Sequence, residues 1–92
     1  MFLSVLALST AFLTGGYWAP PGATDFELRF TQVPDFELNV EEEGLIKCKT
    51  IWPAGKTIAQ ATCETGNIHI LVIDPVKKIV KFDGIRLVKT PE

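Results

Sequence analysis

The sequence predicts an all-β fold, a small antiparallel β-sandwich or barrel of about six to seven short strands with one disulfide. Apolar and polar residues alternate in several short segments, which is the pattern of strands that bury one face. Turn-forming residues separate these segments at a spacing of about ten residues. Beyond residue 16, no segment has the spacing of an amphipathic helix. Two cysteines, Cys48 and Cys63, supply the disulfide.

The chain begins with an uncharged apolar run over residues 2–13, which is followed by small residues that end at Gly16. This arrangement is typical of a secretory signal peptide, and it falls short of the ~20 apolar residues of a membrane-spanning helix. We therefore predict a signal peptide over residues 1–16, a single β domain over residues 17–92, and a secreted, extracellular protein without a membrane span. No Lys or Arg precedes the apolar run, so the alternative is a structural element of the domain.

About seven strands are expected in the domain, since alternating segments are bounded by Gly, Pro, Asn and Asp residues that favour turns. They cover residues 26–30, 36–41, 45–51, 57–62, 68–73, 79–82 and 85–88.

The first two of these strands contain a short repeat, because the tetrapeptide Asp-Phe-Glu-Leu occurs at residues 25–28 and again at residues 35–38. A hairpin with Phe30 opposite Phe36 places the apolar residues of both strands on one face. It also sets Arg29 against an acidic residue, which is a favourable cross-strand pair. The alternative is an arch that places the two strands in opposing sheets.

The next two strands contain the cysteines, and Pro53 and Gly55 interrupt the chain between them, since Pro cannot donate to a ladder and Gly favours turns. In an oxidising compartment, an even number of cysteines predicts a bridge. Closing a loop of this length contributes ~3 kcal/mol in the chain-entropy model. Two buried free thiols are the alternative if the chain is not exported.

The strand over residues 68–73 has apolar residues on both faces, so we expect it to be central in the sheet. After it, Asp83-Gly84 is a strong signal for a type I′ turn. The expected hairpin continues from this turn to a pair between Ile79 and Val88.

The net charge is −2, but acidic and basic residues are unevenly distributed along the chain. Residues 17–43 hold seven acidic residues and one basic residue, whereas residues 44–92 hold eight basic and four acidic residues. A dipolar surface that steers a charged partner is one possible outcome. The simpler expectation is that the two halves pack together and their charges interleave.

Few residues suit catalysis, and we expect that the protein is not an enzyme. No serine follows Ser9, so a domain that begins at residue 17 has no serine nucleophile, and a disulfide would remove the reactive thiolate. The one histidine, His69, alternates with isoleucines, so we expect a packed, hydrogen-bonded side chain rather than a ligand. One histidine without free cysteines makes a poor zinc site, and no cofactor or metal is expected. The negative net charge argues against nucleic-acid binding.

Four residues are candidates for binding: Tyr17, Trp18, Trp52 and Lys56. Trp52 and Lys56 lie on a loop that the disulfide would restrain, and an exposed Trp offers a large contact area for little loss of entropy. The alternative is that Trp52 folds back over the open end of the core. Tyr17 and Trp18 form either a mobile arm or a lid on the sandwich.

The function that we predict is that of a small secreted binding protein, similar to an effector or toxin, which acts through its surface on an extracellular or host protein. The first alternative is an extracellular carrier of a small apolar ligand or lipid, which requires an internal pocket of ~300 Å³ or more. The second is a protease inhibitor that presents the Trp52–Thr57 loop, with Lys56 entering the specificity pocket.

Overall fold

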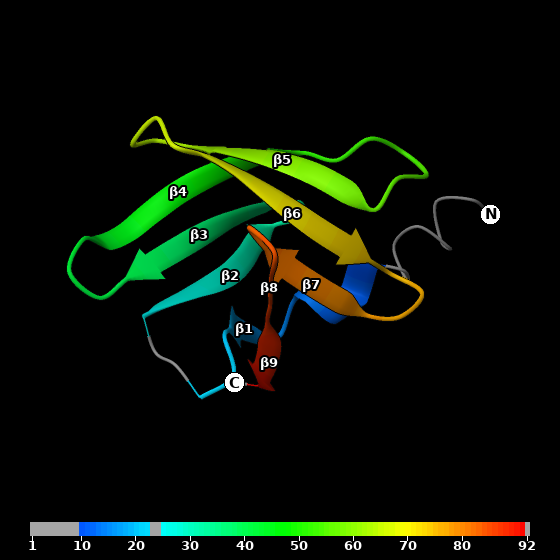
Figure 1. The fold of residues 1–92 in the computed structure, drawn as a ribbon, viewed down its shortest axis with the longest axis horizontal. Helices are drawn as coiled ribbons and strands as arrows, with labels where there is room; N and C mark the ends of the chain where they lie inside the picture. The colour runs from blue at the N-terminus through cyan, green and yellow to red at the C-terminus, as the bar shows by residue number, and fades with distance from the viewer. Residues whose placement is uncertain (1–9, 23–24, 92) are drawn as a thin grey trace.

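The structure is a computed structural model that describes residues 10–22 and 25–91. The described residues form an all-β, antiparallel fold that closes into a nearly complete barrel (Figure 1). The predicted fold class is confirmed. The number of strands among these residues is nine rather than six to seven.

A short 3-10 helix, η1 (Ala11–Leu13), precedes the strands. The strands are β1 (Gly16–Ala19), β2 (Phe26–Gln32), β3 (Asp35–Val40), β4 (Gly44–Ile51), β5 (Ile58–Cys63), β6 (Ile68–Asp74), β7 (Ile79–Phe82), β8 (Ile85–Arg86) and β9 (Val88–Pro91).

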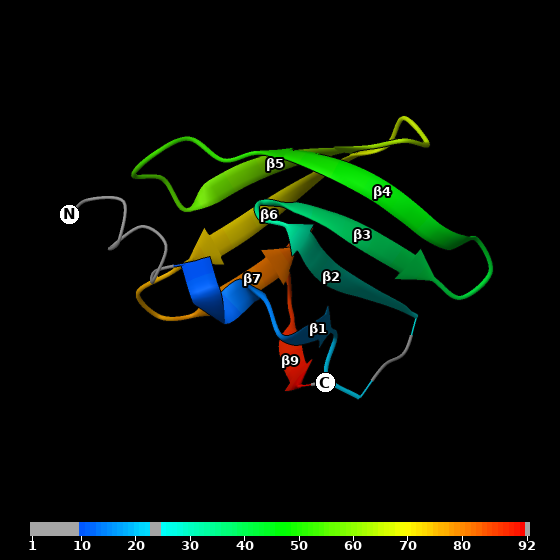
Figure 2. The ribbon, with the colours of Figure 1, turned by 180° about the vertical axis from the view of Figure 1, so that it is seen from behind.

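Strands β1 to β7 form a meander in which each strand pairs with the next, and the last segment of the chain closes the barrel. Within that segment β8 pairs with β7, and β9 pairs with β1. Leu87 lies between them and donates its amide to the carbonyl of Val80 at 2.9 Å. Residues 85–91 therefore bridge the two ends of the sheet, as both views of the ribbon show (Figures 1 and 2).

This closure explains the higher strand count and corrects the expected pairing of Ile79 with Val88. Ile79 pairs with Asp74 of β6, whereas Val88 pairs with Ala19 of β1. The chain leaves β7 after Leu87, so the predicted last strand is split in two. Strand β1 is the additional element, and it begins within the predicted leader.

Local pairing follows the sequence prediction closely. In the β2–β3 hairpin Phe30 faces Phe36 and Arg29 faces Glu37, so the hairpin is confirmed and the arch is wrong. The turn at Asp83-Gly84 has positive φ angles of 48° and 84°, as a type I′ turn requires.

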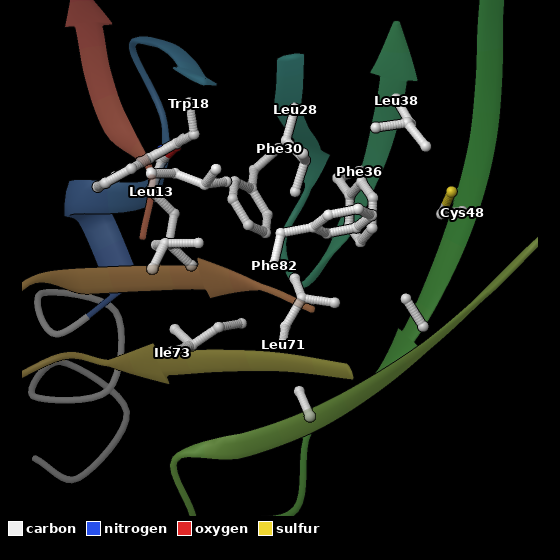
Figure 3. Close-up of a cluster of buried hydrophobic side chains, with 14 of the residues drawn as sticks. Leu13, Trp18, Leu28, Phe30, Phe36, Leu38, Cys48, Leu71, Ile73 and Phe82 are labelled. Atoms are coloured by element: carbon white, nitrogen blue, oxygen red, sulfur yellow. The ribbon is translucent and has the colours of Figure 1, made fainter. Parts of the chain in front are cut away.

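The core is built from aromatic and aliphatic side chains that point into the barrel, with Phe82 at its centre (Figure 3). The ring of Phe82 lies 5.1 Å from that of Phe26 and 6.3 Å from that of Phe36, measured between centroids. The imidazole of His69 stacks on it at 4.6 Å. Phe82 therefore joins β7 to β2 and β3 across the barrel.

The segment before β1 packs onto this core. Leu13 of η1 is fully buried, and its carbonyl accepts a hydrogen bond of 3.1 Å from the indole Nε1 of Trp18. The ring of Phe12 contacts Trp18 edge to face, with centroids 5.9 Å apart. Residues 1–9 of the predicted signal peptide lie outside the described residues. Residues 10–16, the rest of that segment, belong to the folded domain in the structure.

Cys48 and Cys63 lie opposite each other on β4 and β5, with Cα atoms 3.9 Å apart, and form the predicted disulfide. Both side chains are buried on the inner face of the sheet. The bridge closes a sequence separation of 15 residues, which includes the whole β4–β5 loop.

Reduction of this bridge is expected to lower the free energy of unfolding by about 3 kcal/mol, because the unfolded chain regains the entropy that the loop had lost. Urea unfolding with and without a reductant measures the difference. The Cys48→Ala/Cys63→Ala double variant is the control, and it should be destabilised and unresponsive to the reductant. Equal midpoints for the oxidised and reduced protein would contradict the prediction.

Candidate binding surfaces

Trp18 is part of the core and does not offer a binding surface. Its side chain is 4% exposed, and the hydrogen bond to the Leu13 carbonyl satisfies its indole N–H. The pattern of β1 alternates, with Gly16 and Trp18 buried and Tyr17 partly exposed. The prediction that Trp18 is a binding residue is therefore wrong, because strand β1 directs its ring inward against η1.

Tyr17 lies on the outer face of β1, where the guanidinium of Arg29 sits 4.9 Å from the centroid of its ring. Together with Ala19, Pro20 and Val88 it lines an open hollow of about 860 Å³. Tyr17 thus remains partly accessible, and its neighbours on β2 and β3 include the basic Arg29 and, around the hollow, Phe26, Glu27 and Asn39.

Trp52 and Lys56 lie in the β4–β5 loop, which is held together by hydrogen bonds between its own residues. Trp52 packs in part against the core, and its Nε1 donates to the carbonyl of Lys56 at 2.6 Å. The amide of Lys56 donates to the carbonyl of Pro53 at 3.2 Å. The indole therefore bonds to its own loop and also packs in part against the core, and the second of these contacts is in line with the alternative that Trp52 folds back over the core. Both backbone groups of Lys56 are engaged within the loop, whereas a protease inhibitor would present them in an extended segment.

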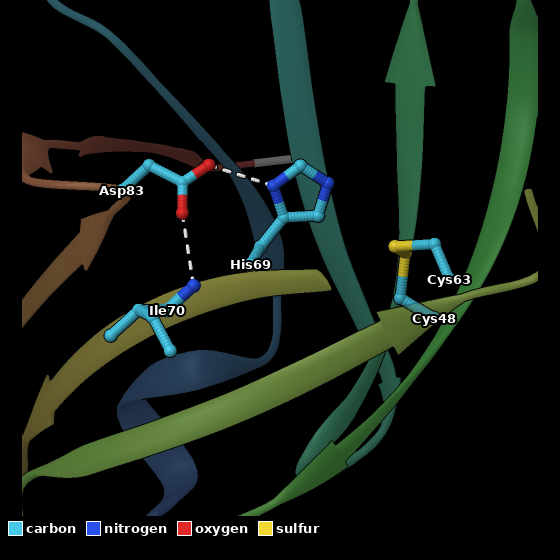
Figure 4. Close-up of polar contacts among 5 residues, drawn as sticks. All are labelled: Cys48, Cys63, His69, Ile70 and Asp83. Atoms are coloured by element: carbon cyan, nitrogen blue, oxygen red, sulfur yellow. Dashed lines mark hydrogen bonds and ion pairs between the residues drawn. A yellow bond between two sulfur atoms is a disulfide. The ribbon is translucent and has the colours of Figure 1, made fainter. Parts of the chain in front are cut away.

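His69 is packed and hydrogen-bonded, as the sequence indicated (Figure 4). Its Nδ1 lies 2.7 Å from Oδ2 of Asp83, and its side chain is 18% exposed. Since a carboxylate can only accept, Nδ1–H is the donor. The other oxygen of Asp83 accepts from the amide of Ile70 at 2.9 Å. The hydrogen bonds of Asp83 to His69 and Ile70 therefore hold the β7–β8 turn against β6.

Aromatic rings and aliphatic side chains are packed against one another in the interior. Phe30 lies 5.7 Å from Phe36, and Phe36 in turn contacts Phe82. The hollow beside Tyr17 and the hollow beside Trp52 are both open to the surface. A carrier would instead need an enclosed apolar cavity between these side chains.

Aliphatic side chains are exposed on the outer face of β4, β5 and β6. Strand β6 has its inner residues His69, Leu71 and Ile73 directed toward the core, while the alternate residues face outward. We call this surface the outer aliphatic face, and it comprises Ile51, Ile58, Ile68, Ile70 and Val72. The exposed fraction of Ile51 is 73% and that of Ile70 is 46%.

The pairing of the strands brings four of these side chains together, whereas the exposed polar residue Gln60 separates Ile51 from Ile70. Ile58 faces Val72 across β5 and β6, while Gln60 lies between Ile51 on one side and Ile70 on the other. The sequence contained a signal for this surface, namely apolar residues on both faces of residues 68–73. This signal predicts a central strand, which is confirmed because β6 pairs with β5 on one side and with β7 on the other. The apolar residues on its outer side are nevertheless exposed.

The charged residues of four turns separate toward the two ends of the barrel. Because the strands form an antiparallel meander, successive turns lie at alternate ends. The β3–β4 and β5–β6 turns lie at one end, and the β4–β5 loop and the β6–β7 turn lie at the other (Figure 1). The first pair carries Glu41, Glu42, Glu43 and Glu64, and the second carries Lys56, Lys77, Lys78 and Asp74. Interleaving of the charges, which was the simpler expectation, is found on the strands, where Glu37 lies between Arg29 and Lys47, whereas these four turns separate the charges.

Among residues 10–22 and 25–91, no three His, Cys, Asp or Glu side chains are grouped so that they could hold a metal ion. Within the same part of the chain, no helix has the length and apolar character needed to span a bilayer.

Comparison with known proteins finds no match to a protein-family model, to a curated protein or to a solved structure.

Proposed function

We propose that the protein is a small, secreted, non-catalytic binding module that recognises another protein through its outer aliphatic face. The observation that carries the proposal is the exposure of Ile51, Ile58, Ile68 and Ile70 on neighbouring strands. Single exposed apolar side chains are ordinary on a protein surface, whereas a contiguous apolar group with a polar rim is typical of an interaction site.

The energetics favour association at this face. Complete burial of one Ile or Val side chain contributes about 1.5–3 kcal/mol, so a partner that covers several of them gains a substantial part of a stable interface. Lys49 on β4 and Lys81 on β7 flank the face. They suit a partner whose apolar centre has an acidic rim, because complementary charges increase the rate and specificity of association.

The position of the face within the sheet also supports the proposal. Strands β5 and β6 are each paired on both sides, so their backbone groups are already hydrogen-bonded and their side chains are held in fixed directions. A rigid surface loses little conformational entropy when it binds. The partner would therefore pack on the face of the sheet rather than add a strand to its edge.

The experiment is a capture assay with the full, oxidised chain as bait, followed by titration of the captured protein. The Ile58→Lys/Ile70→Lys variant is expected to weaken binding more than about 100-fold, since it places two charges in the centre of an apolar interface. The Thr31→Lys variant adds one charge at an exposed position on β2 and should bind as the native chain does.

Equal affinity of the native chain and the Ile58→Lys/Ile70→Lys variant would overturn the proposal. If the captured protein is a second copy of this chain, sedimentation should show a dimer that the double variant dissociates. That result would support the face as the binding surface and identify its partner.

A further inference from the structure

We propose that one end of the barrel docks on an anionic membrane surface, independently of the outer aliphatic face. This end, which we call the basic tip, is formed by the β4–β5 loop and the β6–β7 turn. Its members are Trp52, Pro53, Lys56, Val76, Lys77 and Lys78.

Two segments far apart in the sequence form the tip, and they lie next to each other at the same end of the barrel (Figures 1 and 2). Both line one hollow of about 540 Å³, whose walls include Trp52, Pro53, Pro75 and Val76. The hollow is walled mainly by apolar groups. The tip is therefore an apolar surface that projects beyond the ends of the strands.

Val76 is 90% exposed at the point of the β6–β7 turn. The carboxylate of Asp74 holds the turn, since its Oδ1 accepts from the amides of Val76 at 3.0 Å and of Lys77 at 3.1 Å. These hydrogen bonds fix the backbone so that the Val76 side chain points outward. A fixed, protruding aliphatic side chain suits insertion among lipid headgroups, where apolar burial supplies the affinity.

Trp52 is suited to the same environment. Its indole N–H already donates to the carbonyl of Lys56, so the ring can enter the headgroup region without losing a hydrogen bond. Trp is enriched at membrane interfaces because its ring is amphipathic. Pro53 and Pro75 have no amide hydrogen to leave unsatisfied.

The charges around the tip favour a membrane with an anionic surface. Lys56, Lys77 and Lys78 are exposed. The carboxylate of Asp74, at the end of β6 beside the tip, accepts hydrogen bonds from two backbone amides of the turn. Lysines close to an anionic bilayer each strengthen binding. The acidic Glu41–Glu43 turn lies at the opposite end of the barrel, so the field of the membrane would orient the molecule with its tip toward the lipid.

The test is flotation of the full, oxidised chain with vesicles of phosphatidylcholine alone or of phosphatidylcholine mixed with phosphatidylserine. The native chain should bind the mixed vesicles and not the neutral ones. Lys77→Glu/Lys78→Glu and Val76→Glu should each weaken this binding more than about tenfold. Thr65→Glu introduces the same kind of charge at an exposed position of the β5–β6 turn, and binding should be nearly unchanged.

Tryptophan fluorescence gives a second readout. Trp18 is buried and Trp52 lies at the tip, so a blue shift on vesicle binding should disappear in Trp52→Phe. Circular dichroism verifies that each variant is folded.

Three results would overturn the proposal. The first is failure of the native chain to bind mixed vesicles. The second is binding that persists in the tip variants, because it would arise elsewhere, for example in the apolar run of residues 2–8. The third is loss of protein capture in these variants with unchanged vesicle binding, which would make the tip a protein contact. Unchanged vesicle binding of the uncharged variant Ile58→Ser/Ile70→Ser, together with weakened protein capture, separates this proposal from the proposed function.

Discussion

A chain shortened to begin at Tyr17 is expected to be about 3–6 kcal/mol less stable than a chain shortened to begin at Thr10. Without residues 10–16 the core loses Leu13, which is fully buried, and Trp18 loses the acceptor of its indole N–H. The edge-to-face contact of Phe12 with Trp18 disappears as well. Small domains have only about 5–15 kcal/mol of stability, so the shorter chain should be close to unfolding at room temperature.

Urea unfolding monitored by tryptophan fluorescence measures this difference. Leu13→Ala in the full chain is the matched control, and we expect it to lower the stability by about 2–5 kcal/mol. If both shortened chains unfold at the same urea concentration, residues 10–16 are dispensable and the prediction fails.

The same experiment bears on the predicted signal peptide. A cut after Gly16 would remove a buried part of the domain, whereas a cut before Thr10 would leave every described residue in place. If the protein is exported, we therefore expect its N-terminus, determined from the intact mass, to lie at or before Thr10. A stable, exported protein that starts at Tyr17 would contradict this expectation.

Phe82→Ala is expected to lower the free energy of unfolding by about 3–5 kcal/mol, the usual range for removing a buried phenylalanine ring. The ring contacts Phe26, Phe36 and His69, and these residues come from three different strands. The cavity would lie at the centre of the barrel, where the closed sheet has little freedom to collapse. Urea unfolding of the purified variant measures the loss.

Two further variants make the Phe82 experiment specific. Phe82→Leu keeps part of the volume and should fall between the native chain and Phe82→Ala. Val76→Ala changes a side chain that is exposed at the tip of a turn, and its effect should stay within about 0.5 kcal/mol. Equal stabilities of Phe82→Ala and Val76→Ala would show that Phe82 is not central to the core.

Local features of the fold could be predicted because they depend on neighbouring residues. Alternation fixed the register of β2 and β3, and Asp83-Gly84 identified a turn whose two central residues both need positive φ. The disulfide followed from the number of cysteines and the expected compartment. Each of these features is determined within one hairpin.

Features that depend on distant parts of the chain could not be predicted in this way. The pairing of Val88 with Ala19 joins the two ends of the domain, and nothing in either segment specifies the other. Strand β1 was hidden because its first residue lies in a segment with the composition of a leader.

The binding surfaces were also predicted only in part. Strand β6 has apolar residues on both faces, and this pattern indicates a central strand. It does not reveal that, in the part of the chain that the structure describes, no other layer covers Ile68 and Ile70. The separation of charge follows from the meander, which places alternate turns at opposite ends. Trp52 was identified as a candidate, whereas its neighbour across the tip, Val76, was not.

Site-specific photo-cross-linking tests the central claim most directly, namely that the outer aliphatic face contacts a protein partner. A photoreactive phenylalanine analogue is placed at position 70, in the centre of the face, or at position 31, on exposed β2. We predict a covalent adduct with the captured protein from position 70 and none from position 31. Adducts from position 31 alone, or equal yields from both positions, would contradict the account.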